Sequence, residues 1–323
     1  MKKSRVLWTI MLILVLVTTN SCSLFRKKTT IVDVFWDTSF LQNVTRLTED
    51  RLVKRMPKIS PDGEKLLYGE NDRRGWNIVF FRDVRVPAKT MLISGNSFNS
   101  AWYPNSSNFV YVSIEAGSSR IIRSAITGGG RTYVTRNPVG RNDDLPSVKD
   151  DLILFQTEIT ADNWQIVSMK DNGTEITFLG EGQHPSWHPT EPKFVFTRNG
   201  DVFEMDLESL QATELYSDPN FRSTLPSYSA DGEFIVFQKG AERRVGTTKV
   251  SRVGRLFRSS SRGESTVNKW QIFIMRANGT NLTTITFSTV NSFHPSMDIN
   301  GFVYFVSDAS GYNEIYRARV SLN

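Results

Sequence analysis

The sequence predicts an all-β fold: a six-bladed β-propeller with four-stranded antiparallel blades. Three observations predict it: short apolar runs bounded by turn residues, a segment that recurs six times, and an additional strand-like segment that precedes the first repeat. Aromatic residues make up 11% of the chain, with 21 Phe, and this composition favours strands. Few stretches repeat apolar residues at helical spacing, so helices are not expected.

The recurring segment has a fixed order: a Pro, a polar turn, a buried strand and a further strand. Aligned on the Pro, the six copies are spaced by 44, 45, 39, 41 and 69 residues. A period of about 42 residues is the length of one propeller blade. A Pro suits the start of an innermost strand, where its missing N–H is tolerated. The aligned residues are Pro57, Ala101 (in place of a Pro), Pro146, Pro185, Pro226 and Pro295.

The sixth copy has no outer strand of its own, because the chain stops at Asn323 soon after the third strand of that blade. Residues 43–48 have the pattern of an outer strand, yet they precede the first blade. We therefore expect this segment to complete blade six. That arrangement closes the ring and leaves no open edge between the first and last blades. The propeller is expected to span residues 43–323.

Residues 1–21 are expected to be a signal peptide that is removed from the mature protein. Basic residues precede an apolar run over 6–17, which is too short to span a membrane, since about 20 residues are needed. Small and polar residues follow, and then Cys22, the only cysteine. This pattern resembles a bacterial lipobox, which implies that Cys22 is acylated and that residues 22–42 form a tether. An ordinary secretory signal with an incidental thiol is the alternative.

Three motifs resemble the WD-like repeats of TolB-type propellers. They are the turn Ser-Pro-Asp-Gly at 60–63, the third strand QIFIM at 271–275 and the outer strand Arg-Leu-Thr at 46–48. The resemblance covers nearly all of the chain after the tether, but not the α/β domain that precedes the propeller in TolB itself. It implies a six-bladed fold, an envelope location and an envelope partner such as a peptidoglycan-associated lipoprotein.

No motif of catalytic chemistry accompanies the repeats. The sequence has no G-x-S-x-G elbow and no phosphate-binding loop. His184 and His294 share one repeat position and His188 falls where the first repeat has Ser60, so the repeat explains all three histidines without a metal. We expect no catalytic residue, no metal and no cofactor. The alternative is a propeller enzyme, such as a metal-dependent lyase or lactonase, or a small-ligand or glycan binder, with its site in the central channel.

A fold does not specify a function, so a partner-binding surface has to be sought in particular residues. The residues that precede each repeat Pro should ring the mouth of the channel, with two histidines beside them. These candidates are Arg55, Asn99, Asp144, Gln183, His184, Thr224, Phe293 and His294.

The fifth repeat carries a basic insertion over residues 239–267. It holds eight basic and two acidic residues, and its net charge of +6 equals that of the whole chain. Two interpretations stay open: a solvated loop, or an electrostatic arm for an anionic surface or an acidic protein. Export from the cytoplasm argues against nucleic acid. The residues of the candidate arm are Arg243, Arg244, Lys249, Arg252, Arg255, Arg258 and Arg262.

Taken together, the sequence predicts a lipid-anchored scaffold of the bacterial envelope. It would be held at the periplasmic face of the outer membrane or at the cell surface by the lipid on Cys22. Its propeller would bind an envelope protein and take part in envelope organisation.

Overall fold

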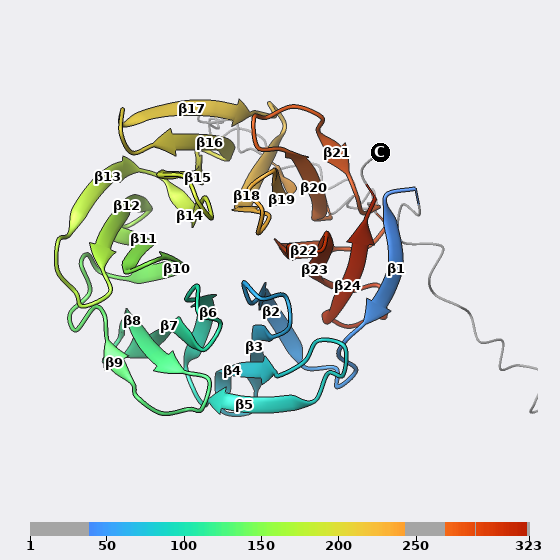
Figure 1. The fold of residues 1–323 in the computed structure, drawn as a ribbon, viewed down its shortest axis with the longest axis horizontal. Coiled ribbons are helices and arrows are strands. Elements are labelled where there is room, and N and C mark those ends of the chain that lie inside the picture. The colour runs from blue at the N-terminus through green and yellow to red at the C-terminus, as the bar shows by residue number, and fades with distance from the viewer. Residues whose placement is uncertain (1–38, 243–268, 288, 322–323) are drawn as a thin grey trace, which may run out of the picture. The chain divides into compact units, whose positions relative to one another are not determined.

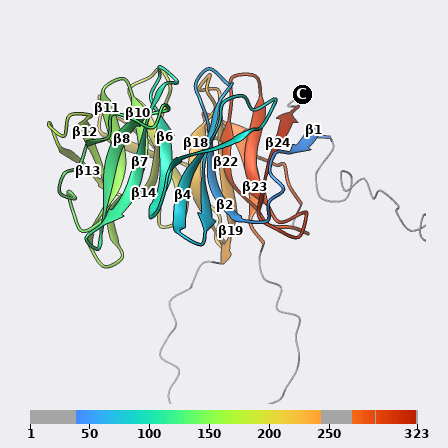
Figure 2. The same cartoon turned by 90° about the horizontal axis from the view of Figure 1, so that it is seen from below.

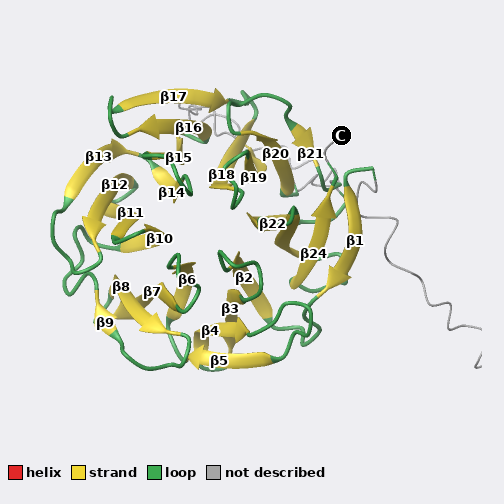
Figure 3. Ribbon diagram, in the orientation of Figure 1, coloured by secondary structure: helices red, strands yellow, loops and turns green. Residues whose placement is uncertain are grey.

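The computed structural model describes residues 39–242, 269–287 and 289–321. Within these ranges the chain forms 24 strands and no helix. The strands make six four-stranded antiparallel sheets around a central axis (Figure 1 and Figure 3). The six-bladed propeller predicted from the sequence is confirmed.

Blades one to three take their strands in chain order, from the innermost strand at the channel to the outermost strand at the periphery. Blade one contains β2 (Val53–Ile59), β3 (Leu66–Asp72), β4 (Gly75–Phe81) and β5 (Lys89–Ile93). Blade two contains β6 (Ser97–Trp102), β7 (Asn108–Glu115), β8 (Ser118–Ala125) and β9 (Thr132–Tyr133). Blade three contains β10 (Asp143–Lys149), β11 (Leu152–Thr160), β12 (Asn163–Lys170) and β13 (Thr177–Glu181).

Blades four and five follow the same order, whereas blade six takes strands from both ends of the propeller. Blade four contains β14 (Gln183–Trp187), β15 (Lys193–Arg198), β16 (Asp201–Asp206) and β17 (Gln211–Tyr216). Blade five contains β18 (Phe221–Tyr228), β19 (Phe234–Glu242), β20 (Gln271–Arg276) and β21 (Thr283–Thr284). Blade six contains β22 (Ser292–Met297), β23 (Phe302–Ser307), β24 (Glu314–Val320) and β1 (Leu41–Arg46).

The two faces of the ring carry different connections, because successive strands of a blade run in opposite directions between them (Figure 2). One face carries the turns between the first and second strands of every blade, and we call it the turn face. The other carries the connections between blades and the turns between second and third strands, and we call it the crossover face.

The second strand of each blade is buried on both sides because the neighbouring blades cover it. In β3, Leu66, Leu67 and Tyr68 are all 0% exposed. Alternate side chains reach opposite neighbours: Leu67 packs with Phe109 of blade two, and Tyr68 packs with Tyr304 of blade six. The hydrophobic clusters therefore lie between blades, and each blade depends on both neighbours for its core.

A β-bulge interrupts the innermost strand of every blade. In blade one, Arg55 pairs with Gly69 and Lys58 pairs with Leu67, so two residues of β2 lie opposite one residue of β3. The first of these two has a positive φ, between 46° and 56°, in all six blades. This backbone conformation is uncommon outside glycine, so its recurrence marks a built feature of the channel wall. The six bulge residues are Met56, Asn99, Leu145, His184, Leu225 and His294.

The bulge corrects the sequence alignment of blade two by one residue. The register of β6 against β7 places Ser100, and not Ala101, at the position of the repeat Pro. Asn99 is therefore the bulge residue of this blade. Phe98, rather than Asn99, is the equivalent of Arg55.

Strand β1 lies beside β24 and closes the ring, as predicted (Figure 1). It covers Leu41–Arg46, two residues ahead of the predicted segment 43–48. Its first residue pairs with Val320 and is 1% exposed, because it packs into the cluster between blades five and six. The tether predicted over residues 22–42 is thus too long, since its last two residues belong to the propeller.

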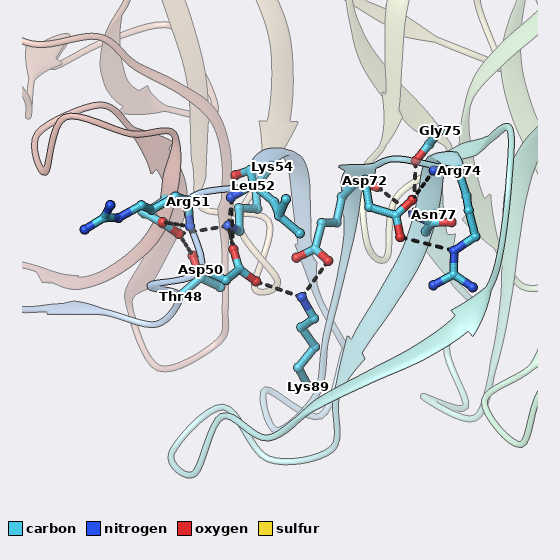
Figure 4. A network of polar contacts seen from close by, with 12 residues as sticks. Thr48, Asp50, Arg51, Leu52, Lys54, Asp72, Arg74, Gly75, Asn77 and Lys89 are labelled. Carbon is cyan, nitrogen blue, oxygen red and sulfur yellow. Dashed lines mark hydrogen bonds and ion pairs between the residues drawn. The ribbon is translucent and has the colours of Figure 1, made fainter.

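A buried polar network lies beside the closing strand. Glu314 is 1% exposed and accepts hydrogen bonds from Thr48 Oγ1 at 2.5 Å and from the Arg51 N–H at 2.8 Å. Its carboxylate is also 3.0 Å from Lys54 Nζ, and Lys54 in turn pairs with Asp50 (Figure 4). The segment between β1 and β2 is thereby fastened to the start of β24.

Strand β19 extends to Glu242, so the basic insertion begins later than predicted. Lys239 lies in this strand, with its Nζ 2.9 Å from Asp218 Oδ2 and 4.4 Å from the centre of the Phe273 ring. It stabilises blade five and is not part of an arm. Residues 243–268 lie outside the described residues, as does Cys22. No helix in the described part of the chain is long and apolar enough to cross a membrane.

Candidate functional site

The central channel holds a cavity of about 340 Å³. Its lining comes from the innermost strands of all six blades and from the turns that follow them. The cavity therefore opens at the turn face and ends at the level of the bulges. Concave sites of this size accommodate small ligands or a short protruding segment of a protein.

The opening of the cavity has an apolar rim contributed by several blades. Ile299, in the turn between β22 and β23, is 57% exposed. Three exposed prolines occupy corresponding turns, and Ala230 lies between them and Ile299 around the ring. Blade three instead contributes Lys149 and Asp150, which have opposite charges. The prolines are Pro61, Pro104 and Pro189.

Three of the residues predicted to ring the channel form one hydrogen-bonded chain. Arg55 Nη2 donates to Asn99 Oδ1 at 2.7 Å, and Asn99 Nδ2 donates to Asp144 Oδ1 at 2.7 Å. The Arg55 guanidinium also lies 4.8 Å from the Trp76 ring and 5.0 Å from the Phe98 ring. Burial raises the pKa of Asp144, although the Asn99 hydrogen bond and the Arg55 charge oppose the rise. These residues hold blades one to three together inside the ring.

The other predicted residues have separate contacts at the same level. Thr224 Oγ1 accepts a hydrogen bond from Gln238 Nε2 at 3.0 Å, and the Phe293 ring lies edge-on to His294 at 4.8 Å. Gln183 borders a second, polar cavity of about 280 Å³ that also includes two arginines. Of the eight predicted residues, Asn99 and His184 line the main cavity at the level of the bulges, and none of the eight forms its apolar rim.

The two channel histidines are neutral at pH 7, because burial lowers the pKa of His184 to about 4 and that of His294 to about 3. His184 Nδ1 lies 2.7 Å from Thr197 Oγ1, and His294 Nδ1 accepts the Met56 N–H at 3.3 Å. The third, His188, is buried in the turn of blade four, where its Nδ1 accepts a backbone N–H at 2.9 Å. Among the described residues no group of three His, Cys, Asp or Glu could hold a metal ion.

Lys58 is a channel residue that the sequence analysis did not single out. It follows the bulge in β2 and lines the main cavity. Burial lowers the pKa of its ammonium group to about 8. Aligning the six repeats on the bulge would have revealed Lys58 as the exception, because four of the other five blades have Ser at this position. The equivalent residues are Ala101, Ser147, Ser186, Ser227 and Ser296.

Comparison with known proteins finds solved structures that share this architecture. No family model matches the sequence, and no curated protein matches it significantly. Among solved structures, a protein assigned as TolB from Agrobacterium tumefaciens is 14% identical, with a TM-score of 0.59 over 87% of this chain and 97% of that chain. The fold is that of a TolB-like propeller.

Solved structures of enzymes are similar to this chain as well. A gluconolactonase from Xanthomonas campestris is 11% identical, with a TM-score of 0.60 over 88% of this chain and 92% of that one. An oligogalacturonate lyase from Vibrio parahaemolyticus is 13% identical, with a TM-score of 0.52 over 86% of this chain and 93% of that one. At such identities the likeness concerns the fold, so function has to be argued from the residues of the channel.

Proposed function

We propose that the chain is a lipid-anchored scaffold of the bacterial envelope whose TolB-like propeller binds an envelope protein at its turn face. The observation that carries the proposal is the apolar rim of the channel, where exposed side chains from four blades surround one concave opening. Exposed apolar groups gathered around a concavity are typical of a protein-binding surface. The resemblance to TolB supports a peptidoglycan-associated lipoprotein as the partner.

The anchor is attributed to Cys22, the only cysteine in the sequence. Each buried acyl CH₂ contributes roughly 0.8 kcal/mol, so two or more chains would hold the protein on a bilayer. Cys22→Ala should abolish labelling by radioactive palmitate and release the protein from the membrane. Unchanged labelling of the variant would contradict the lipoprotein assignment.

Ile299→Asp tests the docking face, because it places a charge on the rim at a side chain that is 57% exposed. Soluble protein that starts at Ser23 would be titrated with purified peptidoglycan-associated lipoprotein in a calorimeter. We expect the variant to bind about tenfold more weakly or worse, a loss of about 1.4 kcal/mol.

Ile114→Asp is the matched control, since Ile114 is 44% exposed and lies near the end of β7 at the crossover face. This variant should bind like the unmodified protein. Equal affinity of the Ile299→Asp variant and the unmodified protein would contradict docking at the turn face. Absence of binding by the unmodified protein would contradict this choice of partner.

The alternative is an enzyme, or a small-ligand or glycan binder, that acts in the channel. The observation that favours it is the cavity of about 340 Å³, which is large enough for a small molecule. Metal analysis and a turnover screen of lactones and glycans with the purified protein separate the two functions. Turnover that Ile299→Asp leaves intact would support the enzyme and count against the scaffold.

A further inference from the structure

The main cavity changes chemical character with depth. Its rim at the turn face is apolar except for Lys149 and Asp150, whose charges offset each other. One level deeper lies the ring that contains Lys58 and four serines, and below it lie the bulge residues. A ligand that enters from the turn face therefore passes a largely apolar rim before it meets Lys58.

Three residues that line the cavity have a hydrogen-bond donor without an acceptor among the described residues. The Lys58 ammonium makes neither a hydrogen bond nor an ion pair, and Ser100 Oγ and Trp187 Nε1 are buried without partners. Trp102 occupies the position of Trp187 in blade two, and its Nε1 donates to the Lys58 carbonyl at 2.8 Å. The repeat itself therefore does not leave this indole N–H without an acceptor. Ser100 Oγ and Trp187 Nε1 are enclosed by protein atoms, so Lys58 carries the unpaired donor that a ligand in the cavity can reach.

The charges near Lys58 leave it uncompensated. Arg55 is offset by Asp144, to which Asn99 connects it. His184 and His294 are neutral at pH 7. The Lys58 pKa falls because burial disfavours its charged form, and no carboxylate counters that effect. At neutral pH the cavity wall therefore holds one free positive charge.

We propose that the channel binds a ligand that carries one carboxylate and a short apolar segment, with the carboxylate paired to Lys58. A carboxylate matches one ammonium in charge and accepts its N–H groups in charge-assisted hydrogen bonds. The apolar segment would contact the prolines and Ile299 at the rim. The carboxylate can belong to a free organic acid or to the carboxyl terminus of a polypeptide. This site goes beyond the proposed scaffold role, because it needs no envelope partner.

Hexanoate is the probe, because it joins a carboxylate to a short alkyl chain, and 1-hexanol is its neutral counterpart. Both would be titrated at pH 7 into soluble protein that starts at Ser23. We expect hexanoate to bind at least about tenfold more tightly than hexanol. Lys58→Met should remove that preference. Lys170→Met is the matched control, since Lys170 pairs with Glu175 at the surface and its loss changes the net charge equally.

The pH dependence supplies a second readout. The affinity for hexanoate should fall as the pH rises above about 8, because Lys58 then loses its proton in the free protein. Lys58→Met should show no such fall. The variant should also melt no lower than the unmodified protein, since it removes a buried charge that has no partner, and this measurement confirms that it folds.

Two results would overturn the proposal: equal binding of hexanoate and hexanol, or equal hexanoate affinity in Lys58→Met and the unmodified protein. A tetrapeptide with a free or an amidated carboxyl terminus distinguishes the two sources. Tighter binding of the free-carboxylate peptide than of hexanoate assigns the ligand to a polypeptide terminus. Weaker binding of that peptide assigns it to a free acid.

Discussion

Replacing Glu314 with Gln removes the negative charge at the centre of the network that fastens β1 to blade six. The carboxylate is buried and contacts the side chain of Thr48, the backbone N–H of Arg51 and the ammonium of Lys54. Gln keeps the shape of the side chain and one hydrogen-bond acceptor. The substitution therefore probes mainly the ion pair with Lys54, whose side chain is 0% exposed.

The expected loss in the free energy of unfolding follows from the burial of this ion pair. Removing one partner of a buried ion pair costs about 3–5 kcal/mol, because the remaining charge is left unpaired. Lys54 keeps Asp50 as a second partner, and the Asp50 side chain is only 34% exposed. We therefore expect Glu314→Gln to destabilise the protein by about 3 kcal/mol, the lower end of this range. In a domain of this size, that loss lowers the melting temperature by about 5 °C.

Thermal and urea denaturation of soluble protein that starts at Ser23, followed by circular dichroism, measures the effect. Glu175→Gln is the control, because Glu175 pairs with Lys170 at the surface with 64% of its side chain exposed. Such exposed pairs contribute about 0–1 kcal/mol. If Glu314→Gln destabilises the protein no more than Glu175→Gln does, the network does not hold the ring closed.

Deleting residues 23–48 removes β1 and should lower the melting temperature far more than deleting residues 23–38, and equal melting temperatures would refute closure by β1. Replacing residues 243–267 with a short Gly-Ser turn should leave the fold intact, since each doubling of loop length costs only about 0.6 kcal/mol. If the insertion is an electrostatic arm, that replacement should weaken binding to anionic vesicles at low salt, whereas unchanged binding would reject the arm. Stability should fall as the pH drops from about 6.5 toward 4, because the unfolded chain takes up protons that His184 and His294 do not. Replacing both histidines with Gln should flatten this dependence in urea denaturation, and an unchanged pH profile would count against their burial.

The blades and their closure were predictable from the sequence because each rests on local signals. The repeat period, the apolar second strands and the missing outer strand of blade six all appear in the order of residues. The assignment fails where a local signal is missing. Blade two has no Pro at the repeat position, so the sequence alignment of this blade was wrong by one residue. The bulge shows that Ser100 is the equivalent of the repeat Pro.

The channel was less predictable because its properties arise from contacts between blades. Nothing local indicates that Asn99 joins Arg55 to Asp144, or that Lys58 lacks a carboxylate while neighbouring cations are offset. The Glu314 network likewise joins residues more than 260 positions apart. Such partners become visible only when the ring is closed.

The central claim, that an envelope protein docks on the turn face, can be tested by site-specific cross-linking. Soluble protein that starts at Ser23 contains no cysteine, since Cys22 is the only one in the sequence. Ile299→Cys and Ile114→Cys would therefore each carry a benzophenone maleimide at a single site, one on the turn face and one on the crossover face. After illumination with isolated envelopes, we expect Ile299→Cys to give a cross-link to the peptidoglycan-associated lipoprotein and Ile114→Cys to give none. Equal cross-linking from both positions, or cross-linking from position 114 alone, would contradict the account.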